Sequence, residues 1–260
     1  FRRVLFRSGY ASSRWNASGL SDAHVLPVVG TKELVASLPL QLGVGPGSTV
    51  VIPTTAYPTY EVGALIAGAT VLATDDPAEA AAAHPALIWI NSPANPHGAI
   101  LSADAMRAWV EAARSVGAVL ASDECYGEFG WEAEPVSVLD PAINGGSLEG
   151  LIAAFSLSKR SNVAGYRAGF LVGDAPLIGE LLAVRKHMGL IVPGPVQAVM
   201  ETMLGDEDHV AMGLQSGGDA YLLKQQVNGK MLALQAYFGV ATRSVELQAR
   251  LRESNRKLQE

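Results

Sequence analysis

The chain has 260 residues, a net charge of −6 at neutral pH and 49% hydrophobic residues. This length allows a substantial core, while the acidic balance argues against a nucleic-acid partner or an anionic membrane surface. A single cysteine, Cys125, excludes an internal disulfide framework, and no apolar run reaches bilayer length, so we expect a cytoplasmic protein that acts on small molecules.

The first eight residues read Phe-Arg-Arg-Val-Leu-Phe-Arg-Ser, an octapeptide that one frame of a common sequencing adapter encodes. We therefore interpret residues 1–8 as a scar and expect an N-terminally truncated domain over residues 9–209. A basic amphipathic arm is the alternative interpretation of the octapeptide.

Between residues 28 and 155, short aliphatic runs alternate with stretches of helical spacing. We predict strands at Val50–Ile52, Thr70–Ala73, Leu87–Ile90, Val119–Ala121 and Leu151–Phe155. We predict helices at Thr31–Leu42, Tyr57–Ala67, Ala78–Ala83 and Ser102–Ser115, with Ser102 as an N-cap. The alternation predicts an α/β fold with a mostly parallel sheet, helices on both faces, and ligands at the carboxyl ends of the strands.

Gly30-Thr31-Lys32 opens the first predicted helix. The free backbone N–H groups and the positive end of a helix suit a bound phosphate at this point. An ordinary capped helix start is the alternative for this motif alone.

Two further loops follow predicted strands and carry polar side chains. Asn95 lies in a rigid Asn-Pro loop, where its amide could donate to a phenolate-like oxygen. Asp123 and Tyr126 follow the next strand, and a buried carboxylate such as Asp123 needs a cationic partner, for which a protonated pyridine nitrogen is suited. Taken singly, each loop is also compatible with a turn or a helix cap.

The most specific motif joins Ser156, Lys159 and Arg167 after the strand Leu151–Phe155. A lysine that binds an aldehyde must lose its proton, which a partly desolvated site favours. The serine and the arginine are donors that suit a phosphate, because a guanidinium forms paired hydrogen bonds with its oxygens.

Together with Ala56-Tyr57-Pro58, these motifs resemble the fold-type I, class I and II aminotransferases over about two thirds of the chain. The strings 30–34, 56–63, 122–126 and 164–173 look most like actinobacterial succinyldiaminopimelate aminotransferases of lysine biosynthesis. The resemblance implies the cofactor pyridoxal phosphate and the transfer of an amino group from an amino acid to a 2-oxo acid.

The resemblance also implies a role for each matching residue. Lys159 would bind the cofactor aldehyde and then move a proton, while Asp123 would keep the pyridine nitrogen protonated. Asn95 and Tyr126 would hydrogen-bond the phenolic oxygen, and Tyr57 would stack on the ring. The residues that would hold the phosphate are Gly30, Thr31, Ser156 and Arg167, with Lys32 as a further candidate.

The chain also departs from the family pattern. His97 replaces the threonine of the usual Asn-Pro-Thr-Gly loop, and no segment matches the small domain that carries the substrate-carboxylate arginine. An inert or binding-only cofactor domain is therefore the alternative function. We expect the parent enzyme to be a homodimer. His24, His84, His187 and His209 show no metal-ligand spacing.

Residues 210–260 do not match the family, and we expect a helical tail there. Gly217 to Lys224 weakly resemble the last strand and lysine loop of a receiver domain, which would suggest a signalling module, but no phosphoacceptor site accompanies them. Gly43 to Gly47 would suggest a nucleotide-binding protein, but they follow a helix and precede a strand, the reverse of a dinucleotide fingerprint.

Overall fold

The computed structural model describes residues 5–130 and 133–205, with side chains from residue 9 to residue 204. The predicted helical tail over residues 210–260 and its receiver-like string lie outside these ranges. Among the residues that are described, no helix is long and apolar enough to cross a membrane.

One sheet organises the described part of the chain. Its seven strands have the order β1-β7-β6-β5-β4-β2-β3. Their bounds are β1 (Val25–Val28), β2 (Thr49–Ile52), β3 (Thr70–Ala73), β4 (Leu87–Asn91), β5 (Val119–Asp123), β6 (Leu151–Ser156) and β7 (Gly169–Gly173). β7 is antiparallel to β1 and to β6, while the pairs from β6 to β3 are parallel. The predicted mostly parallel α/β fold is confirmed.

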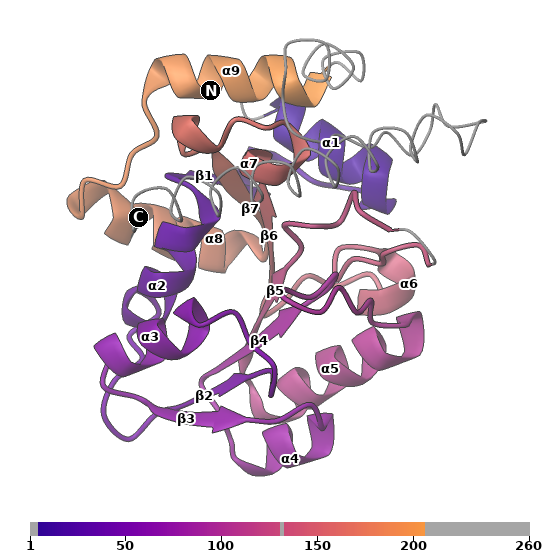
Figure 1. The fold of residues 1–260 in the computed structure, drawn as a ribbon, viewed down its shortest axis with the longest axis vertical. Helices are drawn as coiled ribbons and strands as arrows, with labels where there is room; N and C mark the ends of the chain where they lie inside the picture. The colour runs from indigo at the N-terminus through magenta and orange to yellow at the C-terminus, as the bar shows by residue number, and fades with distance from the viewer. Residues whose placement is uncertain (1–4, 131–132, 206–260) are drawn as a thin grey trace, which may run out of the picture. The chain divides into compact units, whose positions relative to one another are not determined.

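Helices cover both faces of the sheet, as predicted (Figure 1). On one side lie α2 (Thr31–Gln41), α3 (Thr59–Ile66) and α8 (Ala175–His187), which share a core cluster with Leu87 and Trp89 of β4. On the other side α1 (Leu5–Trp15), α4 (Pro77–Ala82), α5 (Ala103–Val116), α6 (Pro141–Asn144) and α9 (Gly194–Gly205) share a cluster with Ile88 and Ile90. Successive side chains of β4 therefore pack into the core clusters on opposite faces of the sheet, as a strand period of two requires.

Local sequence signals explain where α5 begins and ends. The Ser102 hydroxyl accepts a hydrogen bond from the Ala105 amide at 3.2 Å, so the predicted N-cap is confirmed. Gly117 ends the helix in the left-handed conformation, with φ of 70°. The buried residues of α5 itself lie at helical spacing and form its core-facing side, namely Met106, Trp109, Val110 and Ala113.

The predicted elements agree with the structure to within two residues, and the structure contains further elements that the sequence analysis does not predict, among them α6, α8 and α9. The predicted helix 57–67 begins at Thr59, because Pro58 takes the N-cap position. Helix α1 begins at Leu5, inside the octapeptide interpreted as a scar, and it contributes Tyr10 and Trp15 to the core. β7 was not predicted. A Cβ at Gly173 would lie 2.1 Å from the Leu151 carbonyl oxygen, so the pairing with β6 requires glycine there.

Candidate active site

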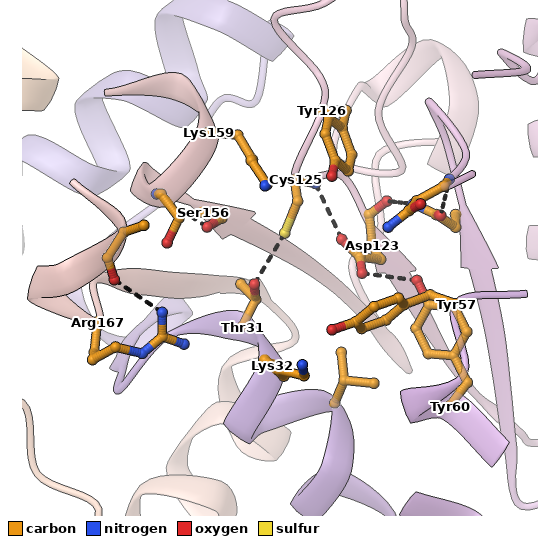
Figure 2. Close-up of a pocket in the computed structure, with 15 residues that line it drawn as sticks. Thr31, Lys32, Tyr57, Tyr60, Asp123, Cys125, Tyr126, Ser156, Lys159 and Arg167 are labelled. Atoms are coloured by element: carbon orange, nitrogen blue, oxygen red, sulfur yellow. Dashed lines mark hydrogen bonds between the residues drawn. The ribbon is translucent and has the colours of Figure 1, made fainter. Parts of the chain in front are cut away.

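A cavity of about 250 Å³ opens where β4, β5 and β6 end and where α2 begins. Nine of the ten predicted site residues line it, and Figure 2 labels all of these except Asn95, around a common space. The nine are Thr31, Lys32, Tyr57, Asn95, Asp123, Tyr126, Ser156, Lys159 and Arg167. The pocket therefore lies at the sheet edge where the topology places ligands.

One end of the pocket is rich in hydroxyl groups and carries a guanidinium. Thr31 is the first residue of α2, and Ser156 caps α7 (Leu157–Arg160) by accepting a hydrogen bond from the Ser158 amide at 3.2 Å. Arg167 donates to the Ala164 carbonyl at 3.0 Å and forms no ion pair with a described residue. A helix start, two hydroxyls and an unpaired cation suit a phosphate dianion.

Gly30 does not line the cavity, but it makes room for Arg167. A Cβ at Gly30 would lie 2.4 Å from the Arg167 Nη2 atom and 2.9 Å from its Cζ atom. Gly30 also has φ of 78°, a backbone conformation that residues with a side chain rarely adopt. The backbone conformation thus favours glycine at this position, and a side chain here would displace the Arg167 guanidinium.

We expect Gly30→Ala to weaken by about tenfold the binding of the pyridoxal phosphate that the sequence resemblance implies for this pocket, because the methyl group pushes the Arg167 guanidinium aside. Gly145→Ala controls for a positive φ, since Gly145 has φ of 68° but no neighbour within 4 Å of its Cβ position. Equilibrium titration with the cofactor measures the effect. Equal affinity for the two variants would contradict a contact specific to Gly30.

The opposite end of the pocket holds a buried carboxylate. Asp123 Oδ2 accepts a hydrogen bond from the Tyr60 hydroxyl at 2.8 Å, and Oδ1 accepts one from the Cys125 amide at 3.1 Å. No lysine, arginine or histidine of the described residues forms an ion pair with Asp123. A buried carboxylate without a cation fits a positively charged ring nitrogen of a cofactor.

The Asn-Pro loop is positioned by Asn91, the last residue of β4. The Asn91 side chain accepts a hydrogen bond from the Asn95 amide at 2.7 Å and donates to the Asp123 carbonyl at 2.9 Å. Asn91 therefore ties two predicted site residues to one another. His97 is exposed and does not line the pocket, so this departure from the family motif lies outside the cavity.

Lys159 extends into the pocket from α7 (Figure 2). Its Nζ atom lies 6.0 Å from the centre of the Tyr126 ring and makes no hydrogen bond or ion pair with a described residue. Burial raises the pKa of the Tyr126 phenol, so this group remains a neutral donor at physiological pH. Because the Lys159 amine lines the pocket and has no partner among the described residues, it is accessible to an aldehyde in the cavity.

The pocket contains residues that we did not predict from the sequence. They include Val35, Tyr60, Asn91, Ser158 and Ala164. Helical spacing from Tyr57 is the signal that could have indicated Tyr60, but that spacing equally describes a core residue.

Cys125 also lines the pocket, with its Sγ atom 3.2 Å from the Thr31 hydroxyl. Burial raises the pKa of its thiol well above the usual range, so the thiol stays protonated and is a poor nucleophile. Among the described residues, no group of histidine, cysteine, aspartate or glutamate could hold a metal ion. His209 lies beyond them.

Comparison with known proteins identifies similar sequences and folds. Residues 18–226 match the family model described as aminotransferase class I and II. The chain is 53% identical over 196 residues to "Probable aminotransferase Rv1178" of Mycobacterium tuberculosis, covering 75% of this chain and 47% of that protein. It is 55% identical over 186 residues to 4-dedimethylamino-4-oxo-anhydrotetracycline transaminase OxyQ of Streptomyces rimosus, covering 72% and 52%.

A solved structure of N-succinyldiaminopimelate aminotransferase from Mycobacterium tuberculosis superposes with a TM-score of 0.72 at 25% identity. The match covers 82% of this chain and 58% of that chain. The present chain spans about half the length of the curated relatives it matches.

Proposed function

Because this chain belongs to the class I and II aminotransferases, whose cofactor is pyridoxal phosphate, we propose that its pocket binds this cofactor through Lys159. We propose further that the chain is the cofactor-binding part of an enzyme that transfers an amino group from an amino acid to a 2-oxo acid. The observation that carries the proposal is the convergence of Lys159, Asp123 and Arg167 on one cavity.

The phosphate would lie at the hydroxyl-rich end of the pocket. Thr31 and Ser156 would donate hydrogen bonds to it, and Arg167 would neutralise its charge. Gly30 would allow this approach by leaving space for the guanidinium. Lys32, whose Nζ atom lies 5.8 Å from the centre of the Tyr57 ring, is near enough to the pocket to add a second positive charge.

The ring would lie between the two ends. When bound, pyridoxal phosphate supplies an electron sink for the carbon that loses a proton. Asp123 would hold a proton on the ring nitrogen, and Tyr57 would pack against the ring face. Asn95 and Tyr126 would donate hydrogen bonds to the phenolic oxygen.

Lys159 would have two tasks. Its amine would bind the cofactor aldehyde, and when free it would move a proton between the substrate α-carbon and the C4′ atom of the cofactor. Both tasks need an amine without a permanent carboxylate partner. The absence of an ion pair to Lys159 among the described residues meets this requirement.

A cofactor titration tests the proposal. Added pyridoxal phosphate should produce a visible absorbance band, and borohydride should then fix the cofactor on the peptide that contains Lys159. Well-folded protein with an unchanged spectrum and no labelled peptide would rule out the cofactor assignment.

For the substrate, we propose N-succinyl-diaminopimelate with 2-oxoglutarate, a step of lysine biosynthesis. The structural likeness to the Mycobacterium tuberculosis enzyme supports this choice. The relative from Streptomyces rimosus is named for a tetracycline intermediate instead. An assay of the full-length parent enzyme with N-succinyl-diaminopimelate and 2-oxoglutarate therefore tests this substrate assignment. We also propose that the parent enzyme is a homodimer.

A binding-only domain is the second candidate function for the chain as it stands. The observation that favours it is that the chain spans about half the length of its curated relatives. In that case the pocket binds pyridoxal phosphate but does not turn over an amino acid. Transamination by this chain would exclude the binding-only function.

A further inference from the structure

The carboxylate of Asp123 is held from two sides by neutral donors. The Tyr60 hydroxyl lies 2.8 Å from Oδ2, and the Cys125 amide lies 3.1 Å from Oδ1. Asp123 is only 7% exposed, so water contributes little to its stabilisation. Of the two donors, the Tyr60 hydroxyl is the one that a substitution can remove.

Tyr60 is held rigidly below the pocket. It is fully buried in α3, and its ring stacks on Trp89 with a centroid distance of 5.0 Å and an interplanar angle of 26°. Tyr57 meets it edge-on at 6.0 Å. Figure 2 shows Tyr60 and Tyr57 on the same side of the pocket as Asp123. The two ring contacts leave the hydroxyl pointing at the carboxylate.

The hydroxyl of Tyr60 is a permanent donor. Burial, followed by the negative charge of Asp123, raises the pKa of the Tyr60 phenol well above its usual range. The phenol therefore keeps its proton throughout the physiological pH range. Its hydrogen bond stabilises a negatively charged Asp123 more than a neutral one, because a charged carboxylate oxygen is the stronger acceptor for the hydroxyl proton.

We propose that Tyr60 is a positioning residue that keeps Asp123 oriented and negatively charged for a protonated ring nitrogen. This inference rests on the proposed function, because it assigns Tyr60 a role toward the same cofactor. The interaction of Asp123 with the ring nitrogen can be an ionised pair or a neutral one. The hydrogen bond from Tyr60 favours the ionised pair, since it stabilises the carboxylate more than the carboxylic acid.

The test compares two cofactors in wild-type protein and in Tyr60→Phe. Phenylalanine keeps the contacts with Trp89 and Tyr57 and removes only the hydroxyl. Pyridoxal phosphate should bind the variant about 10- to 100-fold more weakly, the range expected for one hydrogen bond to a charged group. 1-Deazapyridoxal phosphate, which has a C–H group in place of the ring nitrogen, should bind both proteins with similar affinity.

Two further variants separate this role from a general loss of stability. Tyr10→Phe removes a hydrogen bond of the same kind, from the Tyr10 hydroxyl to Glu128 at 2.5 Å, at a residue that does not line the pocket. Tyr10→Phe should leave unchanged the ratio of the affinity for pyridoxal phosphate to the affinity for 1-deazapyridoxal phosphate. Thr31→Val should weaken both cofactors equally, because both carry the phosphate. An unchanged ratio in Tyr60→Phe would overturn the proposal.

If Tyr60→Phe does not fold, Tyr60→p-aminophenylalanine provides the same test, because its weaker donor should reduce the ratio of affinities by a smaller factor. A ratio equal to that of the wild type would then overturn the role of Tyr60. Failure of the proposed function gives a different result, since wild-type protein would bind neither cofactor and borohydride would not label Lys159.

Discussion

Replacing Lys159 by alanine is expected to abolish the borohydride-stable attachment of pyridoxal phosphate to this chain. The amine of Lys159 faces the cavity without a hydrogen bond or ion pair to a described residue, and its side chain is exposed, so the fold should persist. The visible band should disappear, although Arg167 and the hydroxyl groups would still bind the phosphate weakly. In a complete enzyme, loss of the proton-transferring amine should reduce turnover by about 100- to 10,000-fold.

Lys186→Ala is the control for this substitution, because Lys186 is an exposed residue of α8 that does not line the pocket. It should keep both the band and the labelled peptide. Mass spectrometry of the reduced protein gives the readout. If label persisted in Lys159→Ala on the peptide that contains Lys32, then Lys32 would be the anchor and our assignment would be wrong.

The second large effect concerns pH and Glu124. Burial raises the pKa of the Glu124 carboxyl from 4.5 to about 7, mainly because its charged form loses contact with water. Its Oε1 atom accepts a hydrogen bond from the Val138 amide at 3.0 Å, while Oε2 is buried without a hydrogen-bond partner in the described part of the chain. The folded protein therefore binds this proton more tightly than the unfolded chain does.

The free energy of unfolding should respond accordingly. The contribution of the Glu124 proton is complete below about pH 4.5, and it declines as the pH rises through 7, by about 3 kcal/mol in total. Glu124→Gln should remove this decline, because glutamine is neutral at every pH. Denaturant unfolding at several pH values between 5 and 8 measures the difference.

Glu149→Gln, at an exposed position, is the matched control for Glu124→Gln and should keep the pH dependence of the wild type. A parallel pH dependence of wild type and Glu124→Gln would show that Glu124 is ionised in the folded protein at little cost.

Much of the fold could be predicted from local patterns. The aliphatic runs of β4 and β5 and the capped, periodic α5 depend on residues within a few positions of one another. Strand, helix and cap preferences act over that range, so the sequence indicates them directly. The placement of nine predicted residues in one cavity follows from the rule that parallel strands present their carboxyl ends at a common edge.

Other features depend on partners that are far apart in the chain. Tyr60 and Asp123 are separated by 63 residues, and nothing around either residue indicates their hydrogen bond. The fully buried Arg185 pairs with Glu33 at 2.7 Å across 152 residues, which joins α8 to α2. The antiparallel β7 is also of this kind, because its glycines are explained only by the carbonyl groups of β6.

The sequence by itself therefore determined the alternation of strands and helices between residues 31 and 155 and the chemical types of the groups at the strand ends. Those groups were sufficient to indicate an aldehyde-binding lysine, a carboxylate for a ring nitrogen and a phosphate site. Only the tertiary structure decided which buried groups support them, namely Tyr60 beneath Asp123, Asn91 beside Asn95, and the space that Gly30 leaves for Arg167. The physical reason is that local periodicity acts along the chain, whereas hydrogen bonding and close packing act across it.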